Sequence, residues 1–272
     1  MASLVPNDAP CAERSRDDTA PIKRADHSPP PQFVPLRMNE TLSIDPCVPA
    51  RGEVFVFRFR SQWQRISAHD AATWLTQDET RRAALLPSPA LRYRYISSRA
   101  VLRLAVARLL DCAPDTVDLR DDTKGRLLAQ ATGSDAVLCA DIGYAGVWIM
   151  LGISATHVGL GTSLPSFRSG SDDTNPPISD GSKGSNGFSA VAFGRQRARD
   201  NSMLSAAGYR SSIDSARVSP FVERHTHELA AREPWYVFDL PMPGQLCASI
   251  CSAAPLNIIH AFGWSKRNEN GR

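Results

Sequence analysis

The sequence predicts a mixed α/β protein of the α+β kind, and three observations carry this prediction. Residues 55–60 alternate between a face of phenylalanines and an opposite face that ends in two arginines, which is typical of a half-buried strand. A long apolar stripe over residues 90–110 predicts a helix. Two apolar runs, at residues 136–141 and 147–153, predict a further pair of strands.

The region from residue 70 to residue 111 is expected to be helical in two parts. The first helix begins near Ala71 and ends before Pro87, because proline cannot continue a helix. The second helix covers residues 90–110. Its apolar stripe consists of Leu91, Tyr95, Leu102, Val106 and Leu109.

Arginines are concentrated in this helical region, and no acidic residue lies among them between residues 80 and 110. They are Arg81, Arg82, Arg92, Arg94, Arg99, Arg103 and Arg108. Arg92, Arg99 and Arg103 share one face of the second helix. The pattern favours docking of something anionic, and a solvated helix face is the alternative interpretation.

Two segments are expected to lack structure, and they divide the chain. Residues 1–50 and 165–188 are rich in polar residues, proline and glycine and have no apolar period that could offset the entropy of ordering them. Residues 51–164 form the first folded part between them. Residues 189–272 form a second part, with helices expected at 190–207 and 221–232 and strands at 235–240, 245–252 and 257–262.

Composition limits the classes of function. The net charge of +3 is too small to indicate a nucleic-acid partner. No apolar run approaches the roughly 20 residues that cross a bilayer, so no membrane partner is expected. The N-terminal residues lack the pattern of a secretory signal, which makes a cytoplasmic location the expectation.

The six cysteines have no spacing typical of a zinc site and are expected to be reduced, buried side chains. Cys247 and Cys251 lie four residues apart on one face of their element, but no further metal ligands accompany them. Asp141, near the end of a predicted strand, is interpreted as a turn residue rather than a lone acid catalyst.

Four segments together resemble the first half of the Sfp-type 4′-phosphopantetheinyl transferases. They are LTQDETRR at residues 75–82, RYRYISSRAVLR at 92–103, KGRL at 124–127, and the strand pair that contains Trp148. The resemblance covers residues 53–163 and continues more weakly over 190–262. It implies a pseudo-twofold α/β fold whose second half is degenerate in this chain.

The resemblance also implies a reaction and its participants. Those enzymes transfer phosphopantetheine from coenzyme A to a serine of an acyl or peptidyl carrier protein, and they use Mg²⁺. The family's basic residues that hold the coenzyme A phosphates fall near Arg82 and Arg94, at Arg99 and at Arg126. Arginine suits this task because its planar fork can hold phosphate oxygens in pairs.

The motifs that carry the family's chemistry are replaced here. Residues 142–146 align with a family segment in which a histidine stands where this chain has Tyr144. Residues 159–163 align with a segment whose two acids are replaced by Gly161 and Ser163, which offer no carboxylate to Mg²⁺.

The family's lysine-rich helix aligns with residues 197–208. In that alignment Asp200 and Asn201 replace a Lys-Glu pair, and Ser205 replaces a second lysine. The resemblance therefore identifies no catalytic residue and no metal ligand, and it predicts a transferase-like protein that is weakly active or inactive.

Two alternatives to this pseudoenzyme remain open. The first is a working transferase with displaced metal ligands. The second is a non-enzymatic interaction protein that uses residues 1–50 and 165–188 to bind partners.

Overall fold

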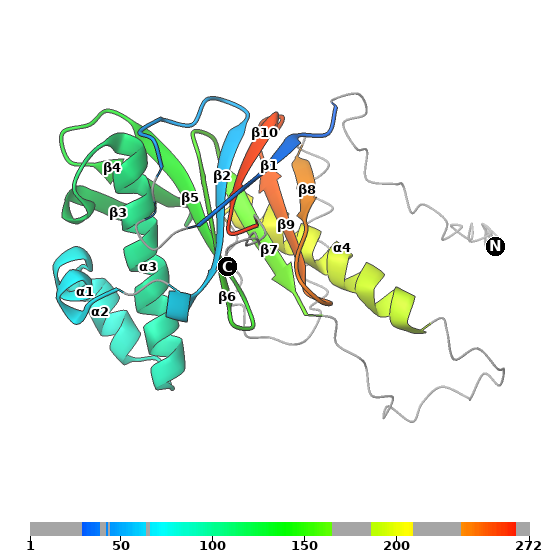
Figure 1. Ribbon diagram of the computed structural model, residues 1–272, viewed down its shortest axis with the longest axis horizontal. Helices are drawn as coiled ribbons and strands as arrows, with labels where there is room; N and C mark the ends of the chain where they lie inside the picture. The colour runs from blue at the N-terminus through cyan, green and yellow to red at the C-terminus, as the bar shows by residue number, and fades with distance from the viewer. Residues whose placement is uncertain are drawn as a thin grey trace, which may run out of the picture.

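The computed structural model describes residues 29–38, 42, 44–63, 66–164, 186–208 and 235–264, and these form two β-sheets flanked by helices (Figure 1). The large sheet has the strand order β1-β10-β2-β6-β5-β4-β3, and the small sheet has the order β7-β9-β8. The mixed α/β class is confirmed. None of the helices in the described part of the chain is long and apolar enough to cross a membrane.

The elements have the following bounds. The large sheet consists of β1 (Gln32–Leu36), β2 (Glu53–Arg60), β3 (Val117–Asp121), β4 (Leu127–Ala131), β5 (Val137–Ala145), β6 (Trp148–Ser154) and β10 (Ile258–Phe262). The small sheet consists of β7 (Val158–Ser163), β8 (Tyr236–Leu240) and β9 (Cys247–Ser252). The helices are α1 (Ala68–Trp74), α2 (Gln77–Ala84), α3 (Pro89–Leu110) and α4 (Asn186–Ala206), with short 3₁₀ turns η1 (Ser61–Trp63) and η2 (Pro114–Thr116).

The elements stack as helix, large sheet, small sheet and helix. Helix α3 packs on one face of the large sheet, where Phe55, Phe57 and Phe59 of β2 join the core. The small sheet covers part of the other face, where Val54 and Val56 lie in a second core. In Figure 1, α1, α2 and α3 lie on the opposite side of the molecule from α4.

Strand β2 is buried on both faces, which corrects the prediction of a half-buried strand. Val54 and Val56 on one face and Phe57 and Phe59 on the other are fully buried. Alternation within β2 cannot reveal the small sheet, because that layer comes from β7 and β9, far away in the sequence. Only Arg60, the last residue of β2, is exposed.

Strand β1 lies within the segment for which the sequence predicts no structure. It pairs in parallel with β10 at the edge of the large sheet, from Gln32 opposite Ile258 to Leu36 opposite Phe262. Pro35 is tolerated because an edge strand does not need every N–H for pairing. The strand is formed by this long-range pairing rather than by a local apolar pattern. Residues 1–28 lie outside the described part of the chain.

The helical region has one more boundary than the sequence predicts. Helix α1 ends at Trp74, and Thr76 begins α2 with a capping box in which Thr76 and Glu79 each satisfy a backbone N–H of the other. Helix α3 starts with Ser88 as its cap and Pro89 at its first position, an arrangement that suits proline. The long second helix is confirmed.

The second part of the chain largely matches its predicted elements. Helix α4 and strands β8, β9 and β10 form where a helix and three strands are expected. Helix α4 begins at Asn186 and so includes the last residues of the expected insert. Residues 165–185 and the helix expected at 221–232 lie outside the described part. Cys139, Cys247 and Cys251 are buried, as predicted, whereas Cys112 is half-buried and Cys47 is exposed, which corrects the prediction for Cys47. Burial raises the pKa of the Cys247 and Cys251 thiols.

Helix α4 lies directly on strand β7, in what we call the α4–β7 contact. Gly159 and Gly161 of β7 face Ala198, Ser202 and Ala206, which recur every four residues on one side of α4. A Cβ atom on Gly161 would lie 1.8 Å from the carbonyl oxygen of Ala198, and one on Gly159 would lie 2.1 Å from that of Ser202. Only glycine allows this approach, because the neighbouring atoms belong to the helix backbone.

The α4–β7 contact predicts a large difference between two glycine substitutions. Gly161→Ala should lower the free energy of unfolding by about 3 kcal/mol or more, because helix backbone must move to admit the methyl group. Gly152→Ala on β6 is the matched control, since its new Cβ would meet side-chain atoms of Leu160 at 3.4 Å, an ordinary contact. That variant should stay within about 1 kcal/mol of the wild type. Urea unfolding measures the free energy of unfolding of both variants. Equal decreases in the two variants would show that α4 does not pack as closely on β7 as described.

Candidate functional site

Asp141 occupies the middle of β5 and connects three elements, so the interpretation as a turn residue is wrong. Its side chain is buried, at 3% exposure. One carboxylate oxygen accepts a hydrogen bond from the Ile142 N–H at 2.9 Å. The other accepts from the Leu160 N–H of β7 at 2.7 Å and from the Ser205 hydroxyl of α4 at 2.5 Å. Asp141 therefore holds the small sheet and α4 against the large sheet.

The positions at which the sequence resemblance would place metal ligands offer neutral groups. Gly161 has no side chain, and the Ser163 hydroxyl donates to the Leu164 carbonyl at 3.4 Å. The Asn201 amide donates to the Thr162 carbonyl at 3.3 Å. Asp200, at the former lysine position, accepts a hydrogen bond from the Gln196 side chain on the same helix at 2.9 Å.

These residues do not fit a magnesium site. Mg²⁺ prefers carboxylate oxygens in octahedral geometry, and the nearby carboxylate of Asp141 already accepts three hydrogen bonds. Across the described ranges, no three or more His, Cys, Asp or Glu side chains converge in a way that could hold a metal ion.

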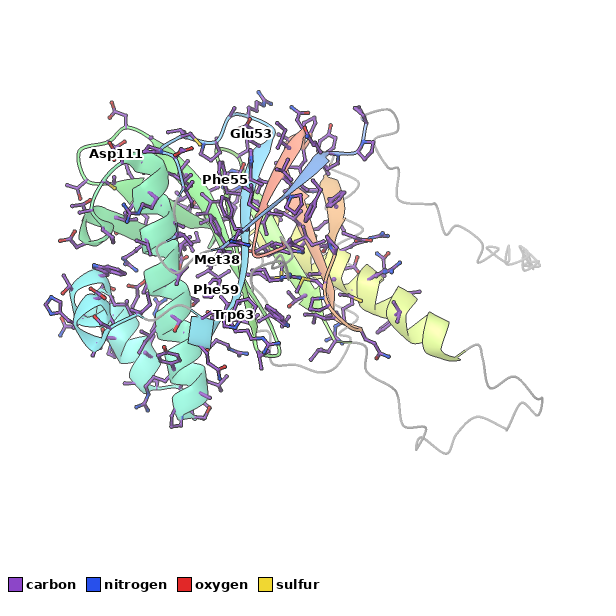
Figure 2. All side chains as sticks on the ribbon, in the orientation of Figure 1. Met38, Glu53, Phe55, Phe59, Trp63 and Asp111 are labelled. Carbon is purple, nitrogen blue, oxygen red and sulfur yellow. The ribbon has the colours of Figure 1, made fainter. Side chains whose placement is uncertain are left out.

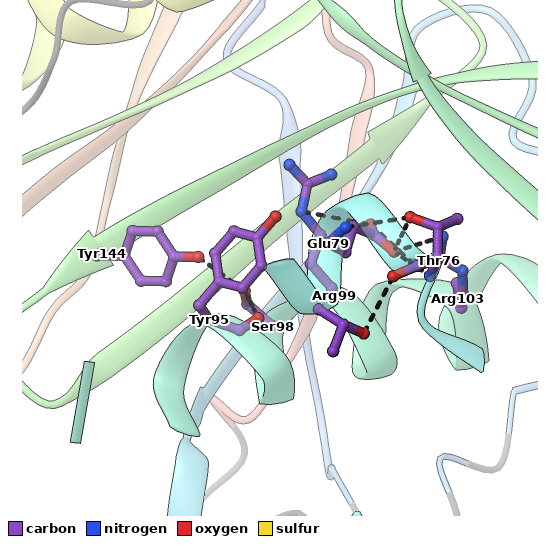
Figure 3. Close-up of polar contacts among 8 residues, drawn as sticks. Thr76, Glu79, Tyr95, Ser98, Arg99, Arg103 and Tyr144 are labelled. Atoms are coloured by element: carbon purple, nitrogen blue, oxygen red, sulfur yellow. Dashed lines mark hydrogen bonds and ion pairs between the residues drawn. The ribbon is translucent and has the colours of Figure 1, made fainter. Parts of the chain in front are cut away.

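A cluster of tyrosines and arginines lies where the first half of α3 meets the β5–β6 hairpin (Figure 3). The Tyr144 hydroxyl is 2.7 Å from the Ser98 hydroxyl. The Arg94 guanidinium lies over the Tyr144 ring, 4.8 Å from its centroid, and donates to the Gly146 carbonyl at 2.7 Å. Burial raises the pKa of Tyr144, and this effect exceeds the opposing influence of Ser98, Arg99 and Arg94.

Glu79 forms a buried ion-pair cluster with two arginines of α3. It is 2.8 Å from Arg103 and 3.8 Å from the Nε of Arg99, and all three side chains are at most 9% exposed. The interpretation of Arg99 and Arg103 as a solvated helix face is therefore wrong. One carboxylate faces two guanidinium groups, so the cluster carries an excess of positive charge.

Buried polar atoms in and beside this cluster that have no hydrogen-bond partner among the described residues include the Tyr95 hydroxyl and the Arg99 Nε. The Arg99 guanidinium lies 5.6 Å from the Tyr95 ring centroid, so the two groups are neighbours. An unsatisfied buried polar group costs about 1 to 3 kcal/mol. The Arg99 Nε still lies 3.8 Å from the Glu79 carboxylate, which therefore balances part of its charge.

The structure brings together two of the four arginines that the family resemblance singles out. Arg94 and Arg99 both lie near Tyr144, close enough to influence its pKa. Arg82 is exposed on α2. Arg126 follows the turn between β3 and β4, where it forms an ion pair with Asp122 at 2.6 Å.

The Asp122–Arg126 pair occupies the arginine with a carboxylate of its own. Burial works against ionisation of Asp122, but hydrogen bonds from the Arg126 side chain and from the N–H groups of Arg126 and Lys124 outweigh it. The pKa of Asp122 falls to about 2 as a result. Arg126 is consequently less available to a phosphate than Arg94 or Arg99. The same turn touches the end of α4, since a Cβ on Gly208 would lie 2.2 Å from the Lys124 carbonyl oxygen.

The roles of two residues of this region, Glu79 and Asp141, are missed by sequence reasoning. Glu79 carries a local signal, because Thr76 and Glu79 have the spacing of a capping box. Its second role, toward Arg103, depends on how α2 packs on α3. Asp141 also gives no local signal, since its partners Leu160 and Ser205 lie far along the chain.

Comparison with known proteins does not identify a family. No model of a known protein family matches the chain, and no curated protein matches its sequence.

The buried cluster predicts that replacing Glu79 destabilises the protein much more than replacing the adjacent Asp78. Glu79→Ala should lower the free energy of unfolding by about 3 to 5 kcal/mol, because it leaves two buried arginines without a counter-charge. Asp78→Ala removes an exposed ion pair with Arg81 and should cost less than about 1 kcal/mol. Urea unfolding measures both.

Thr76→Ala is the control for the capping box that Glu79→Ala also removes, and it should cost about 1 kcal/mol. If Glu79→Ala lowers the free energy of unfolding no more than Thr76→Ala does, the ion pairs of Glu79 with the two arginines do not contribute to stability.

Proposed function

We propose that the chain is a phosphopantetheinyl-transferase-like protein that has lost the transfer reaction and retains a surface for the phosphates of coenzyme A. The proposal includes a pseudo-twofold fold. In support, each part contains a long helix followed in sequence by strands, α3 before β3–β7 and α4 before β8–β10. A carrier protein as partner and a cytoplasmic location belong to the same proposal and rest on the sequence alone.

The α4–β7 contact is the main support for the proposed loss of transferase activity. In the family, Mg²⁺ neutralises the phosphate oxygens that gain charge during the reaction. An acid at position 161 would project into the backbone of α4, where even a Cβ has no room. Losing one electrostatic stabiliser typically costs a hundredfold to a thousandfold in rate, about 3 to 4 kcal/mol, and losing a metal should cost more.

The cluster around Tyr144 supports the retained phosphate surface. Arg94 stacks on Tyr144 and donates one hydrogen bond to a carbonyl, which leaves further guanidinium N–H groups for a ligand. The Arg99 Nε has no hydrogen-bond partner, and the single carboxylate of Glu79 balances only one of two arginine charges. Arg94 and Arg99 would hold the phosphates, and Arg82 and Arg126 would add charge from α2 and from the β3–β4 turn.

The interaction-protein alternative depends on residues 1–50 and 165–188. Most of these residues lie outside the described part of the chain, and no observation on the described residues favours that alternative over the transferase-like protein.

One experiment with two readouts tests the proposal. Calorimetry at low salt should detect binding of coenzyme A and no binding of pantetheine, which lacks the phosphates. Arg94→Ala should weaken binding about tenfold, which corresponds to one charge-assisted hydrogen-bonded pair. Incubation with coenzyme A, Mg²⁺ and a panel of apo carrier proteins should give no gain of the phosphopantetheine mass.

Arg108→Ala, an exposed arginine in the last turn of α3, is the matched control and should bind coenzyme A like the wild type. Absence of heat, or equal affinity for coenzyme A and pantetheine, would contradict the retained surface. A carrier protein that gains the mass at a rate typical of enzymes, with the wild-type chain and not with a mock preparation, would contradict the lost reaction.

A further inference from the structure

A row of alternating aromatic and cationic side chains lies at the end of β2, next to the β5–β6 turn whose Gly146 carbonyl accepts the hydrogen bond from Arg94. The Arg58 guanidinium lies between two rings, 4.4 Å from the Trp264 centroid and 5.1 Å from the Trp148 centroid. The Arg60 guanidinium lies 4.7 Å from Trp148 and 5.5 Å from Trp63. Trp63 and Trp148 also meet edge to face, with centroids 5.2 Å apart.

The inner end of this row is occupied by contacts within the chain. Arg58 donates to the carbonyl oxygens of Gly263 at 2.7 Å and Pro241 at 3.4 Å. The Trp264 indole donates to the same Pro241 oxygen. Burial lowers the pKa of Arg58. This end joins β2, β10 and the segment after β8, and it has a structural role.

The outer end is open, and we call Arg60, Trp63, Val147 and Trp148 the Arg60 surface. Trp63 is 45% exposed and Val147 is 60% exposed. Arg60 is exposed and forms no ion pair with any acid of the described residues. The two indole rings meet at 87°, so the guanidinium can lie flat against at most one of them. No hydrogen bond joins its N–H groups to the other described residues, so they can face a planar anion.

Charge is distributed along the molecule in a way that suits an acidic partner. Asp111, Asp115 and Asp118 follow the C-terminal end of α3, and Figure 2 shows Asp111 and Glu53 far from Trp63. An acidic ligand at the Arg60 surface would therefore avoid repulsion from these carboxylates. Exposed tryptophan and arginine are also the side chains that contribute most to protein interfaces.

We propose that the Arg60 surface binds an acidic peptide segment that carries apolar side chains. A carboxylate of the segment accepts paired hydrogen bonds from Arg60, and its apolar side chain packs on Trp63 and Val147. A nucleic-acid strand fits less well, because it requires several cations along a track and the described residues of this surface include one arginine, Arg60. The interaction does not depend on coenzyme A or on the cluster at Tyr144.

Fluorescence titration of the full chain tests this proposal with the peptide acetyl-Glu-Asp-Leu-Phe-Glu-Asp-amide. Tryptophan emission should change with a dissociation constant on the order of 10 to 100 μM. The same peptide with Gln and Asn in place of the acids should bind at least about tenfold more weakly. Coenzyme A is left out of the assay, so a negative result here leaves the proposed function untouched.

Variants separate the paired hydrogen bonds from simple charge. Arg60→Gln should weaken peptide binding about tenfold, and Arg60→Lys about threefold, since lysine keeps the charge and loses the planar fork. Trp63→Ala should weaken it about tenfold. Arg108→Gln makes the same change of charge on α3 and should have no effect. Circular dichroism checks that each variant is folded.

Three results would overturn the proposal. They are the absence of peptide binding, equal affinity for the acidic and neutral peptides, and equal affinity of Arg60→Gln and Arg108→Gln. A single-stranded oligonucleotide that binds more tightly than the peptide, and loses affinity in Arg60→Gln, would assign the surface to nucleic acid and overturn it as well.

Discussion

The close approach of α4 to β7 is the constraint on which the arrangement of the second layer depends. Gly159 and Gly161 bring the helix backbone within van der Waals distance of the strand, and the small side chains of α4 make the approach continuous. Asp141 then reaches across from the large sheet to the buried edge of β7 that has no paired strand, and to Ser205. Gly161 is also one of the two positions at which the proposed resemblance would place a carboxylate, and a side chain there would meet the backbone of α4.

The arginines of α3 show how position changes the meaning of a charge. Arg103 and Arg99 are buried, and Glu79 from a neighbouring helix makes this burial tolerable. Arg94, five residues before Arg99, stacks on Tyr144 and keeps hydrogen-bonding capacity. Arg60 on β2 is held by tryptophans instead of acids. We assign ligands to the arginines whose charge is not fully balanced by a carboxylate. Arg60 and Arg94 lie against aromatic rings, and Arg99 shares the carboxylate of Glu79 with Arg103.

Local patterns predict most of the elements and few of the contacts that matter for the site. The apolar periods of β2, α3, α4 and the last three strands lie within each element, so the sequence reveals them. Strand β1 contains Pro35 and forms by parallel pairing with β10, which no local pattern encodes. The partners of Arg103 and Asp141 come from other helices and strands. Four arginines could be proposed as ligands from the sequence, but their separation into a cluster at Tyr144 and a pair with Asp122 required the fold.

The hydrogen bond between Asp141 and the Leu160 N–H gives the most direct measurement of how the layers are held together. Strand β7 is an edge strand of the small sheet, and the Leu160 N–H donates to the Asp141 carboxylate rather than to a neighbouring backbone. Amide hydrogen exchange, followed residue by residue by NMR, reports this bond. If Asp141 holds β7 in this way, the Leu160 amide should exchange with solvent only on global unfolding, so its free energy of exchange should approach the free energy of unfolding. Rapid exchange at Leu160, while amides of central strand β9 such as that of Ile250 remain protected, would show that α4, β7 and the large sheet are not held together in this way.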